Sequence, residues 1–164
     1  MRNIVAAVDL SAGSARLLEQ AGELAKGLGA KLWIVHATMA ESSTLLPDLR
    51  IPDLYGMSEL PVTLPVDIEH DRNLTADKFR REHAWLKAAS ARLRERGIEV
   101  SSLLLRGDTV AVVMAKAAEL PADLIVVGSH GHGRVFELLV GSTCEAILRA
   151  ASCPVLVVPS PRGE

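Results

Sequence analysis

The chain has few aromatic residues and no long run of one charge. Its 164 residues carry 3% aromatic and 49% hydrophobic side chains, so an aliphatic core is expected. The aromatic residues are scattered along the chain, which predicts no stacking platform for single-stranded nucleic acid. A formal net charge of -2 argues against nucleic acid as the main partner, because phosphate backbones require a clustered positive excess.

Cysteines and long apolar runs are also scarce. Cys144 and Cys153 are too few for a disulfide framework, so both are expected to be small packing residues, with a redox role as the alternative. The apolar run at 4–8 ends at Asp9 and is too short for a secretory signal. No apolar run approaches the roughly 18 residues that span a bilayer. The sequence therefore predicts a cytoplasmic protein without membrane insertion.

Hydrophobic periodicity predicts alternating strands and helices in a single domain of residues 1–164. The expected strands are aliphatic runs at 4–8, 32–35, 98–105, 123–127 and 155–158. The expected helices are at 15–28, at 75–96 with Thr75 as its cap, between Asp108 and Pro121, and at 142–150. Strands that are aliphatic throughout indicate a parallel sheet covered on both faces. The predicted fold class is therefore α/β: a doubly wound, five-stranded parallel sheet with helices on both faces.

Two segments stand out from this pattern. Residues 38–74 form a long insertion that is rich in proline and turn residues, and its apolar side chains favour docking onto something such as a subunit partner. The helix at 75–96 carries several arginines, which fit either nucleic-acid binding or a solvated outer face. Because Asp77, Glu82 and Glu95 are interspersed at helical spacing, we favour the solvated face.

In a doubly wound sheet, ligands bind beyond the carboxyl ends of the strands. The candidates there are Asp9, Ala37, Gly107 with Asp108, and the glycine-rich loop after Val127. That loop contains Gly128, Gly131, Gly133 and Gly141, and Ser142 to Glu145 predicts a capping box that opens a helix. A helix start with the hydroxyls of Ser142 and Thr143 suits a phosphate chain. The loop is neither a P-loop nor a dinucleotide fingerprint, and glycines alone also fit a set of turns.

The spacing from Gly128 through Gly131 to Gly141-Ser142 resembles the ATP-binding motif of the universal stress protein family. The segments 123–127 and 153–158, the opening strand with Asp9 and Ser11, and Val35-His36-Ala37 resemble that family too, although the 38–74 insertion is longer and richer in proline than its usual pattern. The resemblance covers almost the whole chain. It implies a Rossmann-like fold of the adenine nucleotide alpha hydrolase type.

The resemblance also implies a binding site. Asp9 would contact the nucleoside, and the backbone of Ala37 would meet the adenine edge. The ribose and phosphate loop would comprise Gly128, Gly131, Gly141, Ser142 and Thr143, and His130 resembles the histidine of the family's Ser-His-Gly element. The implied cofactor is ATP, with AMP and ADP left open, and Mg²⁺ or Mn²⁺ bridging the phosphates is compatible with it. The alternative role for Asp9 is a cap at the helix start.

No metal held by protein side chains and no catalytic residue is predicted. His130 and His132 are separated by one glycine and supply too few ligands for a metal site. The leading hypothesis is a nucleotide-binding stress-response or signalling module whose occupancy changes a surface that partner proteins read. The alternative is a slow ATP hydrolase or a nucleotidyl transferase. A structural domain with an empty site fits the complete glycine motif poorly.

The last strand predicts self-association. Residues 155–158 are apolar on both faces and come last, so they are expected at a sheet edge where unpaired backbone groups invite another chain. The family resemblance implies the same contact. We therefore expect a homodimer through this strand.

Overall fold

The computed structural model describes residues 1–38, 68–129 and 141–159, with side chains from residue 76 onward in the second range. Most of the 38–74 insertion and most of the glycine-rich loop lie outside these residues. The insertion's proposed docking role therefore stays a prediction.

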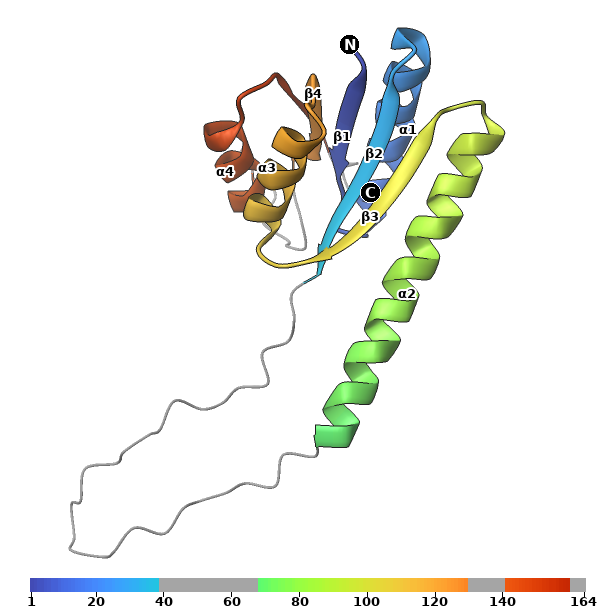
Figure 1. The fold of residues 1–164 in the computed structure, drawn as a ribbon, viewed down its shortest axis with the longest axis vertical. Helices are drawn as coiled ribbons and strands as arrows, with labels where there is room; N and C mark the ends of the chain where they lie inside the picture. The colour runs from blue at the N-terminus through green and yellow to red at the C-terminus, as the bar shows by residue number, and fades with distance from the viewer. Residues whose placement is uncertain (39–67, 130–140, 160–164) are drawn as a thin grey trace, which may run out of the picture.

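Five strands form one parallel sheet. They are β1 (Asn3–Ala7), β2 (Lys31–Thr38), β3 (Val100–Arg106), β4 (Leu124–Gly128) and β5 (Val155–Val158), in the order β3-β2-β1-β4-β5. The helices are α1 (Ala12–Leu28), α2 (Ile68–Glu95), α3 (Thr109–Glu119) and α4 (Ser142–Ala150). Helices α1 and α2 cover one face of the sheet, and α3 and α4 cover the other (Figure 1). The predicted doubly wound fold is confirmed.

Alternate residues of the strands point to two aliphatic cores. On the α1 and α2 side, Ile4, Leu32 and Ile34 are fully buried. On the other side, Val5 and Val35 of the same strands pack with the α3 and α4 residues. Cys144 is buried in this second core and Cys153 packs against it, so the predicted packing role is confirmed. Burial raises the pKa of both thiols, which keeps them protonated and poorly nucleophilic.

Several predicted boundaries were wrong by a few residues, and one by a full two turns. Helix α2 begins at Ile68, so Thr75 lies inside the helix and does not cap it. Residues 68–74 include no glycine or proline that would stop a helix, but they also lack an apolar stripe that would reveal one. The remaining shifts are smaller: α1 starts at Ala12, β2 continues to Thr38, and β3 starts at Val100.

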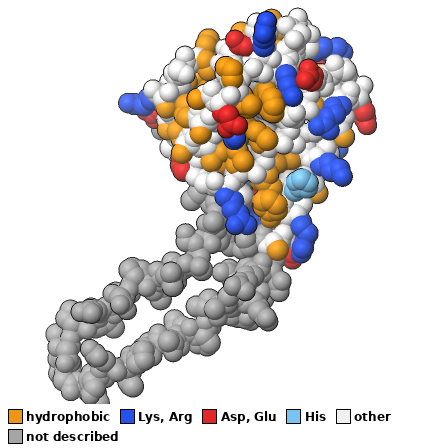
Figure 2. Space-filling view, viewed as in Figure 1, with side chains coloured by type: hydrophobic (Ala, Val, Ile, Leu, Met, Phe, Trp, Pro, Cys, Tyr) orange, Lys and Arg blue, Asp and Glu red, His pale blue; other side chains and the backbone are white. Residues whose placement is uncertain are grey.

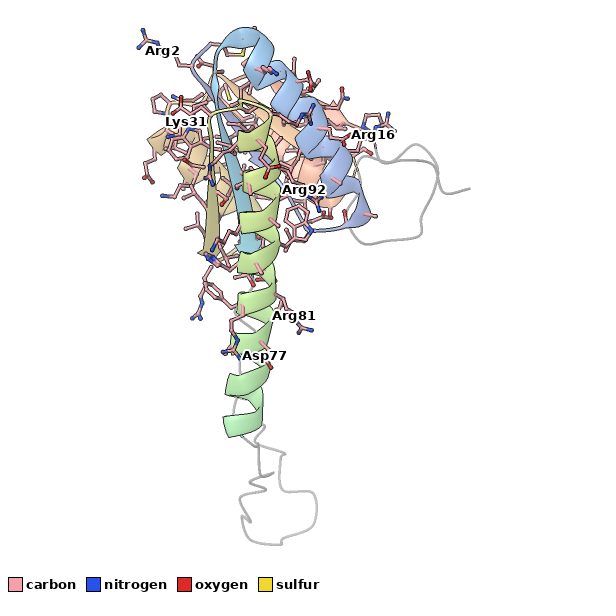
Figure 3. All side chains as sticks on the ribbon, turned by 90° about the vertical axis from the view of Figure 1, so that its right-hand side faces the viewer. Arg2, Arg16, Lys31, Asp77, Arg81 and Arg92 are labelled. Carbon is pink, nitrogen blue, oxygen red and sulfur yellow. The ribbon has the colours of Figure 1, made fainter. Side chains whose placement is uncertain are left out.

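Helix α2 runs past the carboxyl ends of the strands, and Asp77 and Arg81 lie on its projecting part (Figure 3). Three arginines of α2 and the turn after it have protein partners: Arg80 pairs with Asp77, Arg96 pairs with Glu23, and Arg94 donates to the Val100 carbonyl at 2.9 Å. Acidic and basic side chains are also mixed on the face shown in Figure 2. These pairs support the solvated-face interpretation.

Within the described ranges, no helix is both long and apolar enough to cross a membrane.

Candidate functional site

The carboxyl ends of β1, β2 and β4 meet at one edge of the sheet. Ala7 is in register with Val35 of β2 and with Val127 of β4. Asp9 lies two residues after Ala7, and Ala37 lies two residues after Val35. Gly128 follows directly after Val127. Strand β1 lies between β2 and β4, and the connections from these strands go to opposite faces of the sheet. The predicted residues Asp9, Ala37 and Gly128 are therefore brought together at the topological switch point, where ligands bind in such folds.

Asp9 is fixed by the start of α1. Its Oδ1 accepts a hydrogen bond from the Ser11 amide at 3.0 Å and another from the Ser14 hydroxyl at 2.9 Å. Leu10 between them adopts φ 60, a left-handed conformation that costs a residue with a side chain about 1 kcal/mol. Ser11 is the N-cap of α1 and no side chain caps this helix, so the alternative role of Asp9 as a helix cap is wrong. The two hydrogen bonds nevertheless hold the Asp9 carboxylate in a defined position at the edge of the sheet.

The start of α4 is built differently. Gly141 is the N-cap, and its amide donates to the Ser129 carbonyl at 2.8 Å, which joins the helix start to the end of β4. The first bond within the helix runs from the Glu145 amide to the Gly141 carbonyl at 2.9 Å. The amides of Ser142, Thr143 and Cys144 precede that bond, and a glycine has no side chain with which to cap them. This helix start can therefore receive an anion.

The predicted capping box from Ser142 to Glu145 is wrong. Ser142 is the first residue inside the helix, with Gly141 in the cap position. The Glu145 carboxylate does not reach back to the helix start but pairs with Arg149 one turn later, at 2.7 Å. Ser142 and Thr143 are both exposed, so their hydroxyls remain accessible to a ligand.

Four of the candidate positions, His130, Gly131, His132 and Gly133, lie outside the described residues, so their roles stay predictions. Among the residues that are described, no group of three or more His, Cys, Asp or Glu side chains forms a candidate metal site.

Gly107 and Asp108, at the end of β3, serve the fold. Gly107 has φ +139, a conformation that favours glycine, and its amide donates to the Thr38 carbonyl at 3.2 Å. Asp108 caps α3, because its Oδ1 accepts from the Ala111 amide at 2.9 Å.

Sequence reasoning missed a buried polar pair beside this edge. His36 Nδ1 lies 2.8 Å from the carbonyl oxygen of Val8, and His36 Nε2 lies 3.5 Å from Glu82 Oε1 on α2. The prediction that Glu82 belongs to the solvated face was wrong, since its side chain is only 12% exposed. The signal was present: Glu82 falls three residues after Phe79 and four before Leu86, on the apolar stripe of the helix.

Comparison with known proteins agrees with this architecture. The profile of the Universal stress protein family matches residues 1–159. The chain belongs to the universal stress protein family. Universal stress protein A homolog 1 of Coxiella burnetii is 35% identical over 158 residues, which cover 96% of this chain and 95% of that protein.

Two solved structures share the fold of this universal stress protein. One is a universal stress protein in complex with cAMP, with TM-score 0.65, 22% identity and 98% of each chain covered. The other is the universal stress protein from Archaeoglobus fulgidus in complex with dAMP, with TM-score 0.58, 21% identity, and 96% of this chain and 97% of that chain covered.

Proposed function

We propose that this chain is a nucleotide-binding stress-response module and that an adenine nucleotide, with ATP favoured, binds between the end of β1 and the start of α4. The observation that carries the proposal is the glycine-capped start of α4, which Gly141 joins to β4 at the same sheet edge as Asp9. Two family structures that contain cAMP and dAMP support an adenine nucleotide as the ligand class.

Each candidate residue has a role that its chemistry allows. The first-turn amides of α4 and the hydroxyls of Ser142 and Thr143 donate to phosphate oxygens. The Asp9 carboxylate accepts from ribose hydroxyls, and the Ala37 backbone meets the adenine edge without any particular side chain. Gly128 lets the end of β4 approach the ligand closely. A Mg²⁺ or Mn²⁺ ion would be held by the phosphates of the nucleotide.

The proposal does not require turnover of the nucleotide. Universal stress proteins are generally stress-response proteins without enzymatic activity. We therefore expect phosphate release from ATP well below about one per second, the lower end of ordinary enzyme rates. Faster release that is lost in His130→Ala would favour the ATP hydrolase instead.

Gly141→Val tests the binding site. Gly141 has φ -57 and ψ 150, which a valine can adopt, so the fold should survive. The added side chain would occupy the space in front of the helix amides, and we expect ATP affinity to fall by at least about a hundredfold, the loss of two charge-assisted hydrogen bonds. Gly27→Val is the matched control, because Gly27 lies on α1 with no atom close to where its Cβ would be.

The measurements are mass spectrometry of nucleotide released from the purified protein and calorimetry with ATP, AMP and cAMP. Nucleotide retained by the wild type and lost by Gly141→Val is the expected result. A wild type that binds none of the three nucleotides, or a Gly141→Val protein with unchanged affinity, contradicts the proposal.

We further propose a homodimer through β5. The predicted edge position of this strand is confirmed by the strand order, and Leu156 is 37% exposed there. Val155 and Val157 pack inward against the α3 and α4 core, so a charge at Val157 would also disturb the monomer. Leu156→Lys is the cleaner test, because it should shift sedimentation towards the monomer while Leu28→Lys, an exposed position on α1, should not. A wild-type monomer at micromolar concentration, or a dimer indifferent to Leu156→Lys, refutes this contact.

A further inference from the structure

The His36 and Glu82 pair connects α2 to the edge of the sheet where the nucleotide is proposed to bind. The imidazole lies between the carbonyl of Val8, the residue before Asp9, and the carboxylate of Glu82. Both side chains are largely buried, with 9% and 12% of their surfaces exposed. Val8 itself is tied to β2, since its amide donates to the Val35 carbonyl at 3.0 Å.

The hydrogen positions follow from the partners. The Val8 carbonyl can only accept, so the hydrogen bond to it requires a proton on His36 Nδ1. A neutral imidazole then presents Nε2 as an acceptor towards Glu82, whose carboxylate is also an acceptor. The pair is therefore favourable only when a further proton lies between Nε2 and the Glu82 oxygens.

The pair is costly for the fold. His36 Nε2 and Glu82 Oε2 have no hydrogen-bond partner in the part of the chain that the structure describes. A buried ionic pair is often replaced by apolar residues without loss of stability, so its presence is weakly explained by stability alone. The position of the pair points to a different role, because His36 contacts the carbonyl of Val8, the last carbonyl before Asp9.

We propose that Glu82 and His36 are positioning residues for the nucleotide site. Glu82 holds the imidazole, the imidazole holds the Val8 carbonyl, and this chain of contacts fixes the end of β1 from which Asp9 reaches the ligand. The inference rests on the proposed function. By reciprocity, a bound nucleotide then stabilises the docking of α2 by the same factor.

Helix α2 is well placed to transmit this coupling. Its N-terminal part projects beyond the sheet (Figure 3), and Phe79 on this part is exposed, with the Arg106 guanidinium 5.9 Å from its ring centre. Nucleotide occupancy would thus alter how firmly an exposed helix is held. Such a change is a surface difference that a partner protein can recognise.

Calorimetry with ATP on the full chain tests the contact. Glu82→Ala removes the partner of the imidazole, and we expect affinity to fall by about tenfold, a typical coupling between sites. Glu82→Gln should stay within about twofold of wild type, because its amide N–H can donate to Nε2 of a neutral ring. Glu95→Ala, an exposed glutamate on the same helix, is the control and should bind as wild type does. If Glu82→Ala does not fold, Glu82→Leu preserves the packing and should show the same tenfold loss.

Hydrogen exchange supplies a readout that a purely structural role would not change. ATP should slow amide exchange across residues 76–95 in wild type and in Glu82→Gln, but not in Glu82→Ala or Glu82→Leu. The inference is overturned if Glu82→Ala and Glu82→Leu bind ATP with wild-type affinity and show ATP-dependent protection from amide exchange. It is also overturned if Glu82→Gln binds ATP as weakly as Glu82→Ala does. A wild type that binds no nucleotide refutes the proposed function, and the inference with it, whereas normal wild-type binding with insensitive variants refutes the inference alone.

Discussion

Asp9 and Asp123 both accept hydrogen bonds from backbone amides, and they lie at opposite ends of the parallel sheet. Asp9 follows β1 and holds Ser11 and Ser14 at the start of α1. Asp123 precedes β4 and accepts from the amides of Arg2 and Asn3 at the start of β1. The two carboxylates therefore make similar local contacts.

Their surroundings differ. At the amino end, the Asn3 side chain accepts from the Trp33 indole at 3.1 Å, and Lys31 lies 4.2 Å from the centre of the Trp33 ring. At the carboxyl end, Leu10 is a non-glycine residue with positive φ, whereas the positive-φ residues at the amino end, Gly29 and Gly97, are glycines. Helix α4 also begins at the carboxyl end, with Gly141 as its N-cap. A strained non-glycine backbone and a helix start without a side-chain cap are features that binding sites tolerate and that a purely structural end does not need. The two carboxylates are therefore distinguished by their position in the sheet more than by their local contacts, and only Asp9 lies at the proposed nucleotide site.

Within this comparison of the two aspartates, the largest expected effect comes from changing Asp9. Asp9→Asn keeps an oxygen that can accept from Ser11 and Ser14, so stability should change by less than about 1 kcal/mol. Removing the charge should still weaken ATP binding by about tenfold or more, the value of one charge-assisted hydrogen bond. Asp9→Ala should additionally lose about 1 kcal/mol of stability with the contacts at the helix start.

Calorimetry for affinity and urea unfolding for stability measure the two effects separately. The matched control is Asp123→Asn, the same change at the other end of the sheet, which should leave affinity unchanged. Equal affinities for wild type and Asp9→Asn would remove Asp9 from the site.

Gly107→Ala should have a smaller, purely structural effect. Gly107 has φ +139, and a Cβ there would lie 3.1 Å from Val112 Cγ2, so alanine is both strained and crowded. We expect a loss of about 1–2 kcal/mol in the free energy of unfolding. Gly27→Ala on the exposed side of α1 should instead gain up to about 1 kcal/mol through helix propensity. Thermal unfolding of both variants decides whether the backbone at this edge requires glycine, and a neutral Gly107→Ala would show that it does not.

Much of the fold could be predicted because its signals are local. The aliphatic strands and the turn residues between them predict the doubly wound sheet, and Gly29 ends α1 in the left-handed conformation that glycine commonly adopts at the end of a helix. The start of α2 could not be predicted, because the segment from Ile68 to Leu74 has only its two end residues apolar and shows no periodicity.

The candidate site was predictable only in part, because some of its features follow from local sequence and others depend on contacts between distant elements. Asp9, Ala37 and Gly128 follow strands, so parallel topology alone places them at one edge. Gly141 and Ser142 are adjacent, and both are residue types found at helix caps, so sequence could not decide which one caps α4. The contact between His36 and Glu82 joins elements far apart in the chain, and only the packing of α2 on β2 reveals it.

The smallest expected effect is at Asp123, and it disappears in acid. Hydrogen bonds from the Arg2 amide and then the Asn3 amide lower the pKa of Asp123 below its usual range. A carboxylate with a lowered folded-state pKa contributes stability that is present above its unfolded pKa and is lost as the pH falls through the folded value. Asp123→Asn should therefore lower stability slightly at neutral pH, and the gap from wild type should close as the solution is acidified below the ordinary aspartate pKa. Urea unfolding of both proteins from neutral pH down to about pH 3 measures this gap. If this difference in the free energy of unfolding stays constant over that range, the charge of Asp123 does not stabilise the amino end of the sheet. The contrast between Asp123 and Asp9 would then rest on their positions in the sheet alone.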